Sequence, residues 1–161
     1  MIHFDADTNA QRAANGDTVT DLHTEWAVEA GPALTPGGRA LLGRAVAEVH
    51  HGGPVAACER ASIVSDVLSD LFHSADGHIS PTGLLNAACA ELRASVSMAE
   101  GLLALGEDGR PGRTACAVAA VLAYADLCGL DIETVAVLAH TKWSDEVEAE
   151  RFAHIRATRR R

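Results

Sequence analysis

Residues 61–76 read ASIVSDVLSDLFHSAD, and this stretch determines the fold that we expect for the whole chain. Its apolar side chains recur every three or four residues, a spacing that places them along one face of an α-helix. The polar side chains fall between them. We therefore predict an amphipathic helix whose apolar face is buried by other helices. That face is formed by Ile63, Val64, Val67, Leu68, Leu71, Phe72 and Ala75.

The polar side of the same stretch carries the candidate site. Asp66, Asp70 and His73 are separated by four and then three positions, so a helix points these side chains the same way. Two carboxylates and an imidazole are suitable ligands for a divalent cation such as zinc, iron or manganese. The alternative is a polar face that meets water and binds no metal. A second helix would have to complete a metal site, and the side chains considered for this are Glu48, Glu59, Glu91 and His140.

Start and stop signals divide the rest of the chain into further helices. Thr35-Pro36 and Ser80-Pro81 each combine an N-cap side chain with a proline in the first turn, and Gly31-Pro32 ends a helix. We expect helices over residues 17–28, 36–49, 55–75, 81–103 and 114–126, and a last one from 132 onward that Ser144 can divide. Residues 1–16 show little periodicity, so we expect a mobile lead-in to a helical domain over 17–161.

The composition supports an all-α fold. The chain is rich in alanine and leucine, and it lacks the β-branched and aromatic runs that strands favour. Its 161 residues suffice for one domain with a proper core. We predict a single-domain bundle of about five or six helices, with residues 61–76, 80–103 and 114–126 at the centre.

Charge and cysteine content limit the partners and the compartment. The formal net charge of −9 opposes nucleic-acid binding, apart from a short basic tail made of Arg156, Arg159, Arg160 and Arg161. The four cysteines lack the spacings of a zinc site and stand in apolar contexts, so we expect reduced core residues. No apolar run approaches the ~20 residues of a membrane span, and no signal-peptide pattern is present. The expected localisation is cytoplasmic, without membrane contact.

Three further constellations are weaker candidates. Glu146, Glu150 and His154 follow one another at four-residue spacing and can contribute to a magnesium site, or can simply form a charged helix exterior. The doublet His50-His51 fits a helix C-terminus, where an imidazolium complements the helix dipole. His23-Thr24-Glu25 has deaminase-like spacing, but the Pro-Cys-x-x-Cys segment that those enzymes need is missing, which excludes that reading.

One family resemblance rests on residues 118–135, VAAVLAYADLCGLDIETV. This stretch resembles the helix, Gly-Leu-Asp turn and following helix of the all-α NTP pyrophosphohydrolases of the MazG type. The resemblance implies a helical fold and a magnesium-dependent nucleotide hydrolase with paired acidic motifs. The positions before the turn, where the second acidic pair of that family stands, hold Cys116, Ala117, Ala119 and Ala120, so no catalytic residue carries over. Residues 65–76 also resemble a pattern in small helical proteins of actinobacteria and their phages.

Two functions remain open from the sequence. The first is a non-catalytic protein-interaction or regulatory module that needs no cofactor, has a protein partner and forms a homo-oligomer, such as a homodimer. The alternative is a divergent metal-dependent NTP pyrophosphohydrolase, using Mg²⁺ or another divalent cation held by Asp66, Asp70 and His73 with Glu146 or Glu150. The strong helical patterning without a complete catalytic set favours the first.

Overall fold

The computed structural model describes residues 4, 6–30, 35–93 and 109–159, and within these ranges the chain is an all-α bundle of six helices without strands. This confirms the predicted fold class. The helices are α1 (Asn9–Ala30), α2 (Pro36–His51), α3 (Arg60–Ala75), α4 (Pro81–Arg93), α6 (Arg110–Leu127) and α7 (Ile132–Thr158).

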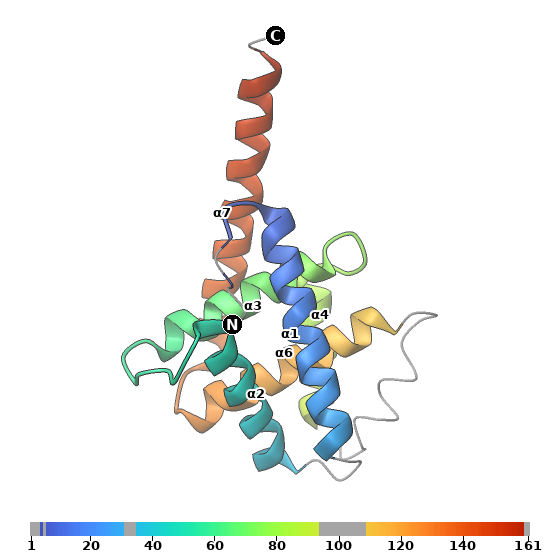
Figure 1. Cartoon of the computed structure of the whole chain (residues 1–161), viewed down its shortest axis with the longest axis vertical. Coiled ribbons are helices and arrows are strands. Elements are labelled where there is room, and N and C mark those ends of the chain that lie inside the picture. The colour runs from blue at the N-terminus through green and yellow to red at the C-terminus, as the bar shows by residue number, and fades with distance from the viewer. Residues whose placement is uncertain (1–3, 5, 31–34, 94–108, 160–161) are drawn as a thin grey trace.

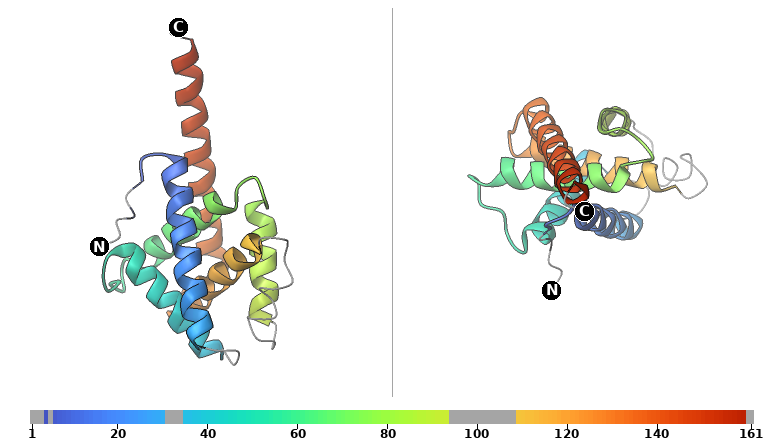
Figure 2. Two further views of the ribbon diagram at one scale, coloured as in Figure 1. Left: turned by 45° about the vertical axis from the view of Figure 1, so that its right-hand side comes forward. Right: turned by 90° about the horizontal axis from the view of Figure 1, so that it is seen from above.

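Helices α3 and α6 form the centre of the bundle (Figures 1 and 2). Helices α1 and α7 pack against α3, whereas α2 and α4 pack against α6. The prediction of a central position is therefore correct for α3 and α6 and wrong for α4. In α4 only Pro81, Leu84 and Ala88 are buried, because the helix lies on the outer side of α6. Its expected continuation to Leu103 lies outside the described residues.

The two central helices are buried in different ways. Helix α6 has short side chains around most of its circumference, and twelve of its eighteen residues are buried. In α3, eleven of sixteen residues are buried, including polar ones, so both of its faces meet protein. Phe72, Leu68 and Leu71 are fully buried on its apolar face. The expected helix is thus confirmed, but its polar side does not face water.

Two glycines allow the outer helices to approach the central ones closely. A Cβ atom at Gly16 of α1 would lie 2.1 Å from the carbonyl oxygen of Asp70 in α3. A Cβ atom at Gly43 of α2 would lie 1.9 Å from the carbonyl oxygen of Ala120 in α6. Only glycine fits at either crossing, because any side chain would displace the backbone of the neighbouring helix.

Several helix ends are set by the local signals that the sequence carries. Thr35 caps α2 by accepting a hydrogen bond from the Gly38 amide at 3.0 Å, and Gly52 ends that helix in the left-handed region with φ 82°. The side chain of Asp131 caps α7 by accepting a hydrogen bond from the Glu133 amide. Helix α7 then continues through Ser144 without a break.

Other ends differ from expectation. Helix α1 begins at Asn9 because Thr8 and Gln11 form a reciprocal cap. The backbone N–H of Gln11 donates to Thr8 Oγ1, and the backbone N–H of Thr8 donates to Gln11 Oε1. Residues 9–16, expected in the mobile lead-in, therefore form the first turns of α1. Helix α3 begins at Arg60 rather than near Val55, and α6 begins at Arg110, four residues early. Cys116 is a core residue as expected, but Cys58 is exposed in the turn before α3.

Helix α7 is the longest helix described and has two distinct halves. Its first half packs on α3, with Val135 and Ala139 buried. Its second half extends away from the bundle (Figures 1 and 2). None of the helices described is long and apolar enough to span a membrane.

Candidate functional site

The polar side of α3 is the centre of a buried network that joins α3 to three other helices. Ser69, Asp70 and His73 are 0, 7 and 4% exposed, although the sequence pattern places them opposite the apolar face. Polar groups at this depth need hydrogen-bond partners, because an unpaired one costs about 1–3 kcal/mol. Helices α1, α2 and α7 supply these partners.

Asp70 connects α3 to α1 and α2. Its Oδ2 atom lies 2.9 Å from Nε2 of His50 and accepts a hydrogen bond from Nδ2 of Asn15 at 3.2 Å. The ring of Phe4 lies against His50 with centroids 4.7 Å apart, and the Phe4 carbonyl accepts a second hydrogen bond from Asn15 at 2.8 Å. The close approach at Gly16 brings Asn15 within reach of Asp70.

Glu146 connects α7 to α3 and α1. Its Oε2 atom lies 3.0 Å from Nε2 of His73 and accepts a hydrogen bond from Ser69 Oγ at 2.9 Å. Its Oε1 atom pairs with Nε of Arg12 at 2.9 Å. The Glu146 backbone carbonyl also accepts a weak hydrogen bond from the Asn9 side chain at 3.4 Å. One carboxylate thus satisfies polar groups of two other helices.

Two more ion pairs lie at the ends of this network. Asp66, one turn before Asp70, pairs with Lys142 of α7. Asp17 of α1 accepts hydrogen bonds from Ser74 Oγ at 2.7 Å and from Arg110 of α6. Asp17 therefore lies within α1, although the first helix was expected to begin at this position, and it links α1 to α3 and α6.

The three residues of the predicted metal site have separate partners. Asp66 binds Lys142, Asp70 binds His50 and Asn15, and His73 binds Glu146. Among the residues described, no group of three or more His, Cys, Asp or Glu side chains is arranged to hold a metal ion. A metal at this site therefore stays a prediction, and it would require these pairs to open.

The four side chains considered for completing that metal site from another helix lie elsewhere. Glu48 pairs with Arg44 at 2.8 Å, and the ring of His140 lies against Trp143 with centroids 5.6 Å apart. Glu59 stands at the N-terminus of α3, and the backbone carbonyl of Glu91 accepts a hydrogen bond from Arg39. The acid that pairs with His73 is instead Glu146, one of the three residues at four-residue spacing with Glu150 and His154. Those two are exposed on the projecting half of α7.

The histidines of α1 and α2 lie in three different environments. The His50 ring contacts the Asp70 carboxylate, and His51 is exposed at the end of α2. His23 is fully buried in α1, and neither ring nitrogen has a hydrogen-bond partner among the described residues. Burial, and secondarily the charge of Arg39, lowers the pKa of His23 to about 4, so its ring is neutral near pH 7.

This arrangement is suited to holding helices together. Asp70, Glu146 and Asp17 each face a base or a hydroxyl at hydrogen-bond distance. Charge-assisted hydrogen bonds between elements far apart in sequence fix the relative positions of α1, α3 and α7.

Comparison with known proteins finds no match, whether to family models, to curated proteins or to solved structures. The MazG-type resemblance therefore stays a prediction. Cys116, Ala117, Ala119 and Ala120, where that resemblance would place the second acidic pair, are all buried.

Proposed function

We propose that this chain is a non-catalytic interaction module that self-associates through the projecting half of α7. The supporting observation is the exposure of this segment. Among the described residues, the last hydrogen bonds and ion pairs between α7 and the bundle are those of Glu146, and the ten positions from Glu148 to Thr158 other than Ile155 are exposed. Phe152 is 52% exposed there. A helix of about three turns is marginally stable alone in water, so a contact along this segment would stabilise it.

The charges of the segment are complementary to those of a second copy. Asp145 and Glu148 stand at its inner end, and Arg156 and Arg159 stand at its outer end. Glu148 and Arg156 lie four positions before and after Phe152, and Asp145 and Arg159 lie seven positions before and after it. At these spacings all four side chains share a helix face with Phe152. If two copies pair antiparallel about Phe152, Glu148 lies opposite Arg156 and Asp145 lies opposite Arg159. The same surface serves both copies, as a two-fold symmetric dimer requires.

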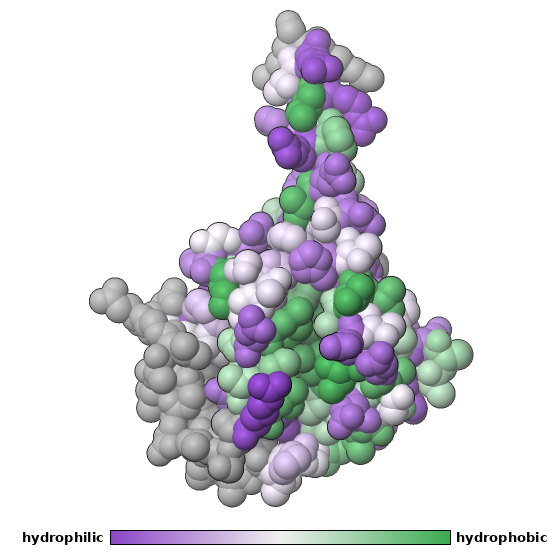
Figure 3. All heavy atoms as spheres, turned by 180° about the vertical axis from the view of Figure 1, so that it is seen from behind, coloured by the Kyte–Doolittle hydropathy of each residue, from purple (hydrophilic) through white to green (hydrophobic). Residues whose placement is uncertain are grey.

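The apolar part of this face is narrow. Ala149 and Ile155 adjoin Phe152, and Figure 3 shows isolated apolar side chains along a projecting helix that is otherwise hydrophilic. The fifteen residues from Asp145 to Arg159, at a rise of 1.5 Å each, give an overlap of only about 22 Å. A contact of this size favours a weak, concentration-dependent and salt-sensitive dimer over an obligate one.

The test is the oligomeric state of the full chain across a wide concentration range, measured by sedimentation velocity. Phe152→Asp should shift the monomer–dimer midpoint to at least tenfold higher concentration. His154→Asp is the matched control, because it introduces the same acid on the opposite side of the projecting helix and should leave the midpoint nearly unchanged. A wild-type monomer at all concentrations would overturn the proposal.

The hydrolase alternative has one specific observation in its favour. Two of its named residues, His73 and Glu146, come together from distant parts of the chain. An imidazole beside a carboxylate is also a common structural pair, and here Arg12 and Ser69 share the carboxylate. The decisive test is whether metal and nucleotide together stabilise the fold.

A further inference from the structure

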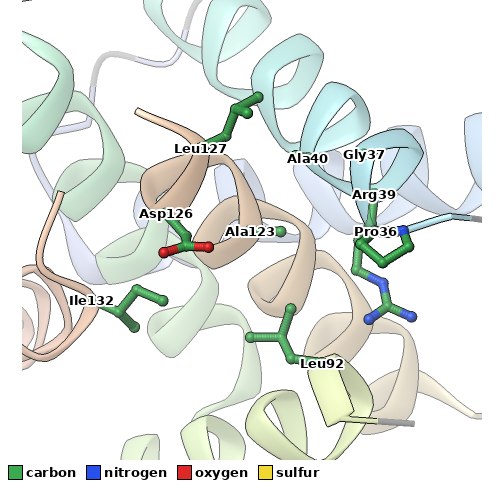
Figure 4. A pocket seen from close by; sticks show the side chains of 9 residues that line it. All are labelled: Pro36, Gly37, Arg39, Ala40, Leu92, Ala123, Asp126, Leu127 and Ile132. Carbon is green, nitrogen blue, oxygen red and sulfur yellow. The ribbon is translucent and has the colours of Figure 1, made fainter. Parts of the chain in front are cut away.

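A cleft with a volume of about 370 Å³ opens between α2, α4, α6 and the start of α7 (Figure 4). This volume lies within the range of small-molecule sites. Most of the lining is apolar, and the charged residues at the cleft are Arg39 and Asp126. Figure 4 shows these two side chains on opposite sides, with Ala123 between them. The cleft therefore has one cationic and one anionic end, separated by apolar surface.

Arg39 is unusual because it is buried without a counter-charge. The residue is 5% exposed, and it makes no ion pair with any carboxylate of the described residues. One guanidinium nitrogen donates to the Glu91 backbone carbonyl at 2.8 Å, whereas Nε has no partner there. Burying a charge is expensive unless it is paired, so this arrangement points to a missing anion.

The charges of Glu91 and Arg39 both act on the nearby Cys116 thiol, but Glu91 contacts the guanidinium only through its backbone carbonyl, and its carboxylate forms no ion pair with Arg39 among the described residues. The two buried titratable groups beside Arg39 are uncharged at pH 7. The pKa of His23 is lowered by burial, and then by the charge of Arg39, so His23 is neutral at pH 7. Burial raises the pKa of the Cys116 thiol to about 12, so that thiol stays protonated. Neither group supplies the negative charge that the guanidinium lacks.

We propose that the cleft binds an apolar molecule with one carboxylate, such as a medium-chain fatty acid. The carboxylate pairs with the Arg39 guanidinium, whose planar fork matches two carboxylate oxygens. The chain of the ligand then runs over Ala40, Ala123 and Leu127, away from the buried end. Asp126 repels a carboxylate at the opposite side, which gives the ligand one orientation. The cleft is distinct from the projecting half of α7, so this proposal stands independently of self-association.

The experiment compares octanoate with octanol, which has the same chain length without the charge, by calorimetric titration of the full chain. Octanoate should bind at least tenfold more tightly than octanol. Arg39→Met should remove this preference, and Asp126→Asn should leave it in place or increase it. Equal binding of the two ligands, or a preference that survives in Arg39→Met, would overturn the proposal.

A second variant tests the proposal independently in case Arg39→Met does not fold. Ala123→Phe fills the cleft from the half-exposed side of α6 and leaves Arg39 untouched. It should abolish octanoate binding while the circular dichroism spectrum stays helical. Unchanged octanoate affinity in a folded Ala123→Phe protein would show that the ligand binds elsewhere and would also overturn the proposal.

Discussion

Nε2 of His73 lies 3.0 Å from Oε2 of Glu146, and this contact joins α3 to α7 across 73 positions of the chain. The carboxylate is shared with Ser69 and Arg12, so one side chain connects three helices. The His73 side chain is only 2% exposed and that of Glu146 14%. Water therefore cannot easily replace a lost partner.

We predict that Glu146→Ala lowers the free energy of unfolding by about 2–4 kcal/mol, because it leaves a buried histidine, a buried hydroxyl and Arg12 without their acceptor. Urea denaturation at neutral pH measures the loss. Glu150→Ala, an exposed acid on the same helix, is the control and should change stability by less than about 0.5 kcal/mol. Equal losses in the two variants would mean that the network does not stabilise the bundle.

The helix crossing at Gly16 predicts a sharp difference between two glycine substitutions. Gly16→Ala places a Cβ 2.1 Å from the Asp70 carbonyl oxygen, so α1 must move away from α3, at a cost of about 1–3 kcal/mol or more. Gly37→Ala, in the first turn of α2, meets nothing within 4 Å and should be neutral or stabilising, because alanine favours the helix. Thermal unfolding of both variants tests this, and a Gly16→Ala protein as stable as Gly37→Ala would contradict the crossing.

The sequence allows helix caps and apolar helix faces to be predicted, but it does not show which residues far apart in the chain pair with each other. The caps at Thr35 and Asp131 and the apolar face of α3 follow from spacing and side-chain type alone. The pairing of His73 with Glu146 does not, because periodicity reports the face of a helix and not which element covers it. From the sequence, this polar face fits either a metal site or a surface that meets water, and burial by other helices is not visible in the pattern.

Two signals for the missed features were nevertheless present. Thr8 and Gln11 have the spacing of a capping box, which marks the start of α1. Gly16 in the middle of a helix indicates close approach by another backbone, because glycine otherwise weakens a helix. Together they would have placed residues 9–16 in the first helix and against a neighbour.

His23 predicts how stability depends on pH. Its pKa falls from 6.5 in the unfolded chain to about 4 in the folded protein, so the unfolded state binds the proton more readily. The free energy of unfolding should therefore decrease as pH falls from about 6.5 to 4, by up to about 3 kcal/mol from this group. Above pH 6.5 its contribution should be constant.

The variant His23→Leu isolates that contribution. It removes two buried nitrogens without described partners, so it should be neutral or stabilising at pH 7. Urea denaturation at pH 7 and pH 5 should show a smaller loss in the variant than in the wild type. The same loss in both proteins would assign the pH dependence to other groups.

Metal and nucleotide binding distinguishes the two proposed functions. For an interaction module, we expect no thermal shift of chelated protein with Mg²⁺, Mn²⁺ or Zn²⁺, alone or with nucleoside triphosphates. A ligand at a hundred times its dissociation constant would stabilise the fold by about 2.7 kcal/mol, which moves the midpoint by several degrees. A shift that needs both metal and nucleotide, and that Asp66→Ala and Asp70→Ala abolish, would favour the hydrolase.

Charge exchange on the projecting half of α7 tests both the partner and its orientation. In an antiparallel pair centred on Phe152, Glu148 of each copy faces Arg156 of the other. Glu148→Arg alone brings two arginines together at both contacts, and Arg156→Glu alone brings two acids together, so each single variant should weaken the dimer. The double variant restores opposite charges and should recover most of the wild-type affinity.

This recovery requires a second copy in that register, because residues 148 and 156 are about 12 Å apart along one helix and do not pair within a chain. Sedimentation velocity at low salt measures all four proteins, and raising the ionic strength should reduce the differences among them. If the double variant dimerises more weakly than both single variants, the antiparallel register is wrong. Self-association would then have to use the apolar surface of the bundle, where Leu127, Val137 and Leu138 are exposed.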